Sequence, residues 1–243
     1  METQIRTGLN RTGVGMSPIA IKKMLKDNDA LAPVDAAEPL GVSPIRERYI
    51  IESTYIGTVP VPATLKGVLE TGKAAFTGEK AQVLIDKMGE RLAFERGGVR
   101  LYEALLSKCS ALPDALPGAT VEQLTHFREE EADHFEMLRE SMLELGADPT
   151  AQTPSADITG IESSGLFQVI GDPRTSLLQS LHAVLTAELV DQVAWEELIT
   201  LAEQFNYRQF ASQCRRALEQ ENNHLATIRS LVSDLTLAEA KQF

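Results

Sequence analysis

Two copies of a Glu-x-x-His motif are the residues in this 243-residue chain whose types and spacing best suit chemistry. The first copy pairs Glu131 with His134, and the second pairs Glu221 with His224. Residues three apart on an α-helix lie about 60° apart around its axis, so both side chains of a pair can reach one metal ion. Carboxylates and imidazoles are both ligands for divalent metal ions. The two motifs therefore predict a metal site.

An internal repeat supports this interpretation. Each half of the chain presents a glutamate, an aromatic residue seven positions later, and then a Glu-x-x-His motif. The residues are Glu95, Tyr102, Glu131 and His134 in the first half and Glu188, Trp195, Glu221 and His224 in the second. We therefore predict six metal ligands, namely Glu95, Glu131, His134, Glu188, Glu221 and His224.

Four long helical segments are expected to position these residues. Apolar residues recur at steps of three and four over residues 79–107, 120–146, 172–205 and 206–235, which is the pattern of bundle helices. Each of the six ionisable residues falls inside one of these apolar series. Thr120 with Gln123, Asp172 before Pro173, and Asn206 with Gln209 are the expected N-terminal caps of the last three segments.

The connections between the segments predict the fold. Short connections make the first and second segments, and the third and fourth, two antiparallel hairpins, while residues 147–171 form a long crossover. We predict an all-α protein with a ferritin-like four-helix bundle over residues 79–243. Residues 1–78 hold six of the eleven prolines, which predicts an irregular arm with short helical pieces at 19–25 and 64–76. Because Tyr49, Ile50 and Ile51 are apolar, we expect this arm to pack on the bundle or on a partner subunit.

Buried charge must be compensated in such a core. An unpaired buried carboxylate costs several kcal/mol, and the apolar series contain no Lys or Arg. We expect Arg91, Arg96 and Arg100 on the outer face of the first helix. Two divalent cations would balance the four carboxylates, with the two imidazoles completing the ligand shells. The adjacent Gly97 and Gly98 predict a close approach or a bulge near Glu95.

The other candidate residues are expected on surfaces or in packing. We expect exposed or flanking positions for His126 and His182, solvated helix faces for Glu129, Glu130, Glu196 and Glu197, and burial for Cys109 and Cys214.

Composition excludes several classes of function. The net charge of −12 argues against nucleic acid and anionic membranes as partners. The chain has no apolar run of 18 residues and no secretory signal pattern, so we expect a cytoplasmic protein. Two isolated cysteines exclude a disulfide framework, a zinc ribbon and a rubredoxin-type iron site within this chain.

The segments ERLAFERGGVRLYEAL, EEEADHFEML and LEQENNHLATIRSL resemble the metal-ligand helices of the ferritin-like di-iron carboxylate proteins, which include rubrerythrins, bacterioferritins and ferritins. The resemblance covers residues 79–235. It implies two iron ions per chain, bridged by Glu131 and Glu221. It also implies that Glu95 with His134 completes one iron position and Glu188 with His224 the other, with Tyr102 as the aromatic residue near the site.

The resemblance also bears on activity. It implies an oxidoreductase that reacts with O₂ or H₂O₂, either a peroxidase or a ferroxidase. Rubrerythrins carry a further carboxylate where this chain has Asp191, which is either a peroxide-linked switch or a polar flank. We name Tyr102, Asp191 and Trp195 as catalytic candidates. The chain has no rubredoxin domain, so peroxide reduction would need an external electron donor.

Three alternatives remain open at the level of sequence. The first is a di-manganese catalase or a mixed iron–manganese site, because the same ligands suit manganese. The second is a bundle whose metals only stabilise it while the arm binds a partner protein. The third concerns assembly: we expect a homo-oligomer, a dimer in the simplest case, although a monomer fits the composition as well.

Overall fold

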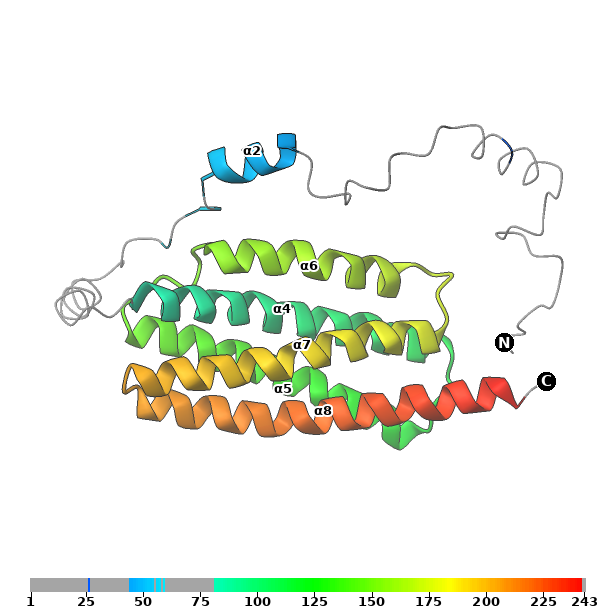
Figure 1. Cartoon of the computed structure of the whole chain (residues 1–243). Coiled ribbons are helices and arrows are strands. Elements are labelled where there is room, and N and C mark those ends of the chain that lie inside the picture. Colours follow the sequence, from blue (N-terminus) through cyan, green and yellow to red (C-terminus); the bar gives the residue numbers. More distant parts are fainter. Residues whose placement is uncertain (1–25, 27–43, 55, 58, 60–80, 242–243) are drawn as a thin grey trace. The chain divides into compact units, whose positions relative to one another are not determined.

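The computed structural model describes residues 26, 44–54, 56–57, 59 and 81–241 (Figure 1). The chain divides into two units, Met1–Tyr55 and Ile56–Phe243. The first unit contains helix α2 (Pro44–Glu52). The second contains helices α4 (Ala81–Ala111), α5 (Gly118–Glu144), α6 (Pro154–Gly171), α7 (Leu177–Gln204) and α8 (Arg208–Ala240). The described residues contain helices and no strand, which confirms the all-α prediction.

The second unit is a helical bundle built from two antiparallel hairpins. Short turns join α4 to α5 and α7 to α8. In Figure 1, α4 and α8 run in one direction while α5 and α7 run in the other. Helix α4 contacts α5 and α7, and α8 contacts α5 and α7, so the two hairpins close around a common core.

The predicted crossover contains a helix. Helix α6 occupies Pro154–Gly171 within the connection expected over 147–171, for which no helix was predicted. It crosses the length of the bundle from the end of α5 to the start of α7 and contacts α4 and α7 (Figure 1). The connection therefore runs along the bundle as expected, and the helix within it is an addition to the prediction.

Contacts with α4 fix the start of α6. The Thr153 hydroxyl accepts a hydrogen bond from the Ala156 amide and donates to the backbone oxygen of Asp86. The Asp86 carboxylate accepts from the amide of Ser155 at 2.9 Å and from its hydroxyl at 2.6 Å. Unpaired amides of a first helical turn are satisfied in this way by side chains of the turn and of a neighbouring helix.

The expected N-terminal caps are wrong at all three positions. Helix α5 begins at Gly118, directly after Pro117, and has no side-chain cap. Helix α7 begins later than predicted, with a capping box formed by Ser176 and Gln179. Helix α8 also lacks a side-chain cap, because Asn206 has a φ of 61° and turns the chain instead.

A band of polar side chains divides the bundle core into two apolar clusters. One cluster includes Met88, Leu138, Met142, Trp195, Leu198 and Cys214. The other includes Leu101, Leu105, Cys109, Phe127, Leu181 and Ile228. Along each of α4, α5, α7 and α8, residues of one cluster give way to residues of the other across this polar band. Both cysteines are free and buried, as predicted.

Helix α2 is described by itself. Its Tyr49, Ile50 and Ile51 are exposed, and the packing expected for the arm stays a prediction. The short helices predicted at 19–25 and 64–76 lie outside the described residues. None of the described helices is long and apolar enough to span a lipid bilayer.

Candidate metal centre

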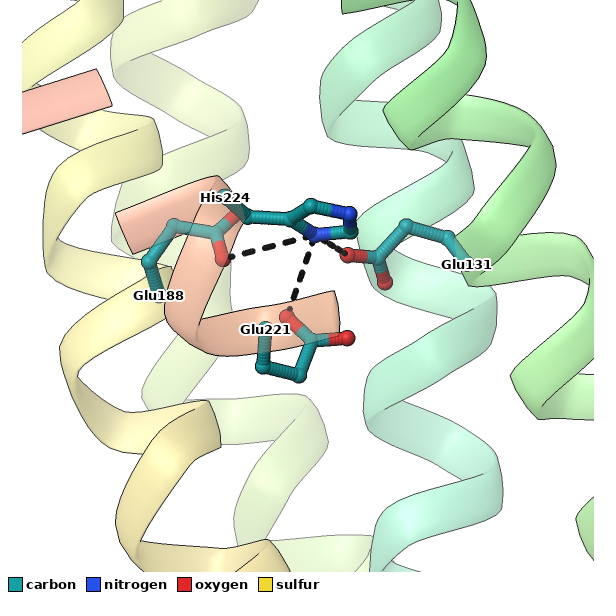
Figure 2. A group of neighbouring side chains, drawn as sticks. All are labelled: Glu131, Glu188, Glu221 and His224. Atoms are coloured by element: carbon teal, nitrogen blue, oxygen red, sulfur yellow. Dashed lines mark ion pairs between the residues drawn. The ribbon is translucent and has the colours of Figure 1, made fainter. Parts of the chain in front are cut away.

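All six predicted metal ligands are buried and lie in the polar band. Their ligand atoms form two groups, in each of which the atoms lie within 4.8 Å of one another. The first, called here the His224 group, contains Glu131, Glu188, Glu221 and His224 (Figure 2). The second, called here the His134 group, contains Glu95, His134 and Glu221. Glu221 is the member common to both groups, whereas Glu131, the other residue expected to bridge, belongs to the His224 group alone.

Each group surrounds the Nδ1 atom of its histidine. His224 Nδ1 lies 3.2 Å from Glu221 Oε2, 3.5 Å from Glu131 Oε1 and 3.8 Å from Glu188 Oε2 (Figure 2). His134 Nδ1 lies 2.8 Å from Glu221 Oε1 and 3.5 Å from Glu95 Oε2. The two oxygens of the Glu221 carboxylate therefore face different histidines. A carboxylate in this position is arranged to link two cations.

The other ring nitrogen of each histidine is held by a polar side chain of the opposite hairpin. His134 Nε2 lies 2.9 Å from the amide oxygen of Gln220, and His224 Nε2 lies 2.8 Å from Glu130 Oε2. Both partners can only accept from the ring, so each Nε2 carries hydrogen and donates it. In a neutral imidazole the lone pair is then on Nδ1 and is directed toward the carboxylates. Second hydrogen bonds of this kind orient metal-binding histidines in proteins.

Unsatisfied polar atoms concentrate at this site. Eight buried side-chain atoms of the described residues make no hydrogen bond. Six of them are Glu95 Oε2, His134 Nδ1, Glu188 Oε2, both carboxylate oxygens of Glu221, and His224 Nδ1. Buried polar atoms in native proteins nearly always have a partner. Because a cation in each group would satisfy these atoms, the residues present fit two metal ions.

The protonation behaviour of the histidines shows how strong the negative charge is. Burial lowers the pKa of His134, but the carboxylates of Glu221 and Glu95 outweigh that effect and raise the pKa from 6.5 to about 11. Burial likewise lowers the pKa of His224, and Glu131 and Glu221 raise it to about 12. The carboxylates therefore make this part of the core strongly negative and favour positive charge on both histidines.

The carboxylates respond in two ways. Burial, together with the neighbouring Glu221, raises the pKa of Glu131 and that of Glu188 well above 4.5. Burial also raises the pKa of Glu221, but the two histidines outweigh it and lower the pKa to about 2. Glu221 therefore stays ionised, consistent with its place between the two groups.

Arg91 is a correction to the sequence analysis. The prediction placed it on the outer face of α4, whereas its side chain is only 2% exposed and forms ion pairs with Asp191 and with Glu95. The neighbouring expectations are confirmed, since Arg96 and Arg100 are exposed. One basic residue does therefore lie in the core, at the edge of the His134 group.

Asp191 and Trp195 belong to the same buried arrangement as Arg91. The Trp195 indole donates to Asp191 Oδ2 at 3.1 Å, and its ring lies 5.6 Å from the ring of His134. The guanidinium of Arg91 lies 5.3 Å from the Trp195 ring. Asp191 is in neither ligand group, and its contacts connect Trp195 through Arg91 to Glu95.

Tyr102 lies on the other side of the site, next to a small cavity. Its hydroxyl donates to Glu188 Oε1 at 2.6 Å. Burial and the Glu188 charge raise the pKa of Tyr102 well above 10, so the hydroxyl keeps its proton. The cavity has a volume of about 10 Å³ and is lined by Phe94, Gly98, Leu101, Tyr102, Glu131, Val184, Ala187, Glu188 and Asp191. This volume is about that of one water-sized molecule.

Glu130 is a second correction. The prediction placed it on a solvated face, whereas it is buried, holds His224 and accepts from the Gln220 amide at 2.6 Å. Glu129, Glu196 and Glu197 are exposed as predicted, and so are His126 and His182. Glu130 lies three residues after the buried Phe127 and four before His134, a spacing that could have identified it.

No protein-family model, no curated protein and no solved structure matches this chain. The resemblance to the ferritin-like family therefore stays a prediction from the sequence.

Proposed function

We propose that the chain is a dinuclear non-haem iron oxidoreductase of the ferritin-like type that reacts with O₂ or H₂O₂. The observation that carries the proposal is the shared carboxylate. Glu221 directs one oxygen toward His134 Nδ1 at 2.8 Å and the other toward His224 Nδ1 at 3.2 Å. This geometry supports two adjacent ion positions, and the up–down–down–up order of the four main helices is compatible with the proposed type.

The chain's own residues define how each ion would be held. His224, Glu131 and Glu188 would bind one ion, His134 and Glu95 the other, and Glu221 would bind both. Two divalent iron ions held there would supply two electrons, which together with two protons from solvent reduce H₂O₂ to two water molecules, and an external electron donor would restore the electrons. Iron is preferred to manganese only through the family resemblance, because the ligands suit both metals.

The cavity beside Tyr102 supports a small oxidant as substrate. Its volume of about 10 Å³ is that of one water-sized molecule, a scale that suits a small oxidant such as O₂ or H₂O₂. Glu131 and Glu188 line both this cavity and the His224 group. A small molecule in the cavity therefore lies directly against the metal ligands, with the Tyr102 hydroxyl available as a hydrogen-bond donor.

Metal analysis followed by an oxidant assay tests the proposal. Protein purified without added metal or chelator is analysed by mass spectrometry, and we expect about two iron ions per chain. The iron-loaded protein is then mixed anaerobically with H₂O₂ and a reductant, and peroxide consumption is compared with that of Glu221→Ala. A chain that contains no metal and takes up no Fe(II) would refute the proposal.

The same assay separates the related activities. A peroxidase consumes H₂O₂ only while reductant is present. A ferroxidase consumes O₂ in proportion to added Fe(II) and releases Fe(III). Two manganese ions, with O₂ evolution from H₂O₂ in the absence of reductant, would indicate catalase chemistry instead. Metals that bind but support none of these reactions would indicate a stabilising role.

A further inference from the structure

We propose that the two metal positions are unequal, and that the His224 group binds its ion first and more tightly than the His134 group. The inference rests on the proposed dinuclear centre and adds the order in which it is filled. Three independent features of the structure favour the same position. They are the number of carboxylates, the location of Arg91, and the difference between Glu130 and Gln220.

The first feature is the ligand set. The His224 group contains the carboxylates of Glu131, Glu188 and Glu221, whereas the His134 group contains only those of Glu95 and Glu221. Carboxylates are negatively charged ligands for hard divalent ions. The additional carboxylate gives the His224 group more negative charge and one more ligand.

The second feature is competition for Glu95. The Arg91 guanidinium donates to Glu95 Oε1 at 2.5 Å, and both side chains are buried. A cation at the His134 group therefore meets a glutamate that already has a positive partner. The corresponding side chain in the other group, Glu188, is bonded to the neutral hydroxyl of Tyr102. The repulsion from Arg91 is thus confined to one of the two positions.

The third feature lies behind the histidines. His224 donates to a carboxylate, Glu130, while His134 donates to a neutral amide, Gln220. A hydrogen bond to a carboxylate raises the basicity of an imidazole more than a bond to an amide does, which strengthens the imidazole as a ligand. The imidazole of His224 is therefore the better donor.

The orientation of Gln220 follows from its neighbours. Its NH₂ group donates to Glu130 Oε1 at 2.6 Å, which a carbonyl oxygen could not do. The amide oxygen is therefore the atom that accepts from His134. A continuous hydrogen-bonded chain runs from His134 through Gln220 and Glu130 to His224. The ring of the exposed His126 also lies 3.5 Å from Glu130 Oε1.

The experiment is an anaerobic titration of metal-free protein with Co(II). Binding is measured by calorimetry and by the visible absorption of the bound ion. The wild-type chain is expected to bind two ions in two steps whose affinities differ by at least about tenfold. Glu188→Ala, which alters only the His224 group, should remove the tight step. Glu95→Ala, which alters only the His134 group, should remove the weak one.

A pair of charge variants tests the cause. Glu130→Gln is expected to weaken the tight step by about 10–100-fold, the usual effect of removing such a partner. Glu129→Gln is the matched control, because it removes the same charge from the neighbouring, exposed position and should leave both steps unchanged. The exchange Glu130→Gln/Gln220→Glu keeps one carboxylate and one amide in the chain of hydrogen bonds, so it should narrow or reverse the difference. The double variant also tests the cause of the difference if Glu130→Gln alone does not fold.

The outcomes distinguish the two proposals. Two equal steps in the wild-type chain, or equal effects of Glu130→Gln and Glu129→Gln, would overturn the unequal filling and leave the dinuclear centre intact. Failure of the folded wild-type chain to bind either Co(II) or Fe(II) would overturn the centre itself and the inference with it.

Discussion

The backbone of Gly98 on α4 lies directly against the Glu131 carboxylate of α5. A Cβ atom at position 98 would come within 1.9 Å of Glu131 Oε2, a distance at which the carboxylate has to move. The adjacent Gly97 has no such neighbour, since a Cβ atom there would lie 3.6 Å from the Phe167 ring. Of the two glycines, only Gly98 is required for the observed position of the Glu131 carboxylate.

Gly98→Ala is therefore expected to displace Glu131 and to reduce the metal content from about two ions per chain to about one. The helix itself should persist, because alanine favours helix over glycine by about 1 kcal/mol. Metal content by mass spectrometry and the helical signal by circular dichroism measure the two effects separately.

Gly97→Ala is the matched control for this substitution. It should keep both metal ions and leave the melting temperature unchanged or slightly raised, because its Cβ atom meets only an ordinary contact. Equal metal content in the two variants would contradict the role assigned to Gly98.

Glu221→Ala is expected to have a larger effect on metal binding than Glu188→Ala. Glu221 belongs to both ligand groups, and Glu188 belongs to one. The first variant should lose most of both ions, while the second should keep about one ion per chain. Metal analysis after equilibrium dialysis checks this, and equal losses would show that Glu221 is not shared.

The metal-free protein is expected to become less stable as the pH rises from 5 to 9. The pKa values of Glu131 and Glu188 are raised well above 4.5 in the folded chain, and those of His134 and His224 are raised to about 11 and 12. The folded state therefore binds more protons than the unfolded state over this range. For each proton that the folded state binds in excess of the unfolded state, the free energy of unfolding falls by about 1.4 kcal/mol for every unit by which the pH rises.

Metal should reverse this trend, because its ligands bind in deprotonated form. Melting temperatures measured with chelator and with Mn(II) between pH 5 and 9 would show a metal-induced increase that grows with pH. The opposite contribution of Glu221, whose pKa is lowered to about 2, is lost only in stronger acid. A metal-free melting temperature that rises from pH 5 to 9 would be inconsistent with the buried charges described here.

Arg91→Met is expected to destabilise the metal-free chain by about 3–5 kcal/mol, because it leaves the buried Asp191 without its counter-charge. The double variant Arg91→Met/Asp191→Asn removes both charges and keeps an acceptor for the Trp195 indole. It should unfold at a higher urea concentration than Arg91→Met alone. Additive effects of the two substitutions would show that Arg91 and Asp191 are not coupled.

The six predicted metal ligands could be identified from the sequence because they interrupt a regular apolar pattern. Arg91 and Glu130 were missed although each continues a buried series, Arg91 between Met88 and Glu95 and Glu130 between Phe127 and His134. Both are charged residue types, which are usually exposed, and Glu130 also lies in the charged run from Arg128 to Glu131. The pairing of His134 with Gln220 and of His224 with Glu130 joins α5 to α8 across long sequence separations, so no local pattern could reveal it.

The positions at which helices begin were predicted less well than the existence of the four long helices. At the start of α6, Thr153 and Pro154 form a helix-start signal, yet no helix was predicted in the connection over 147–171. Packing against α4 and α7 stabilises this helix in spite of Gly160 and Gly165. The start of α7 was misplaced because Asp172 is a local turn residue that accepts from the Arg174 amide, while Ser176 and Gln179 form the cap.

Neither ligand group is complete within one hairpin. The His134 group needs Glu221 from α8, and the His224 group needs Glu131 from α5. During synthesis on the ribosome, α8 is made after α4, α5, α6 and α7, so the residue that both groups require arrives late. The first hairpin alone cannot capture the ions of the proposed centre. In the cell, metal insertion would therefore be a late step of maturation. It would occur only after the α4–α5 hairpin has packed against the α7–α8 hairpin.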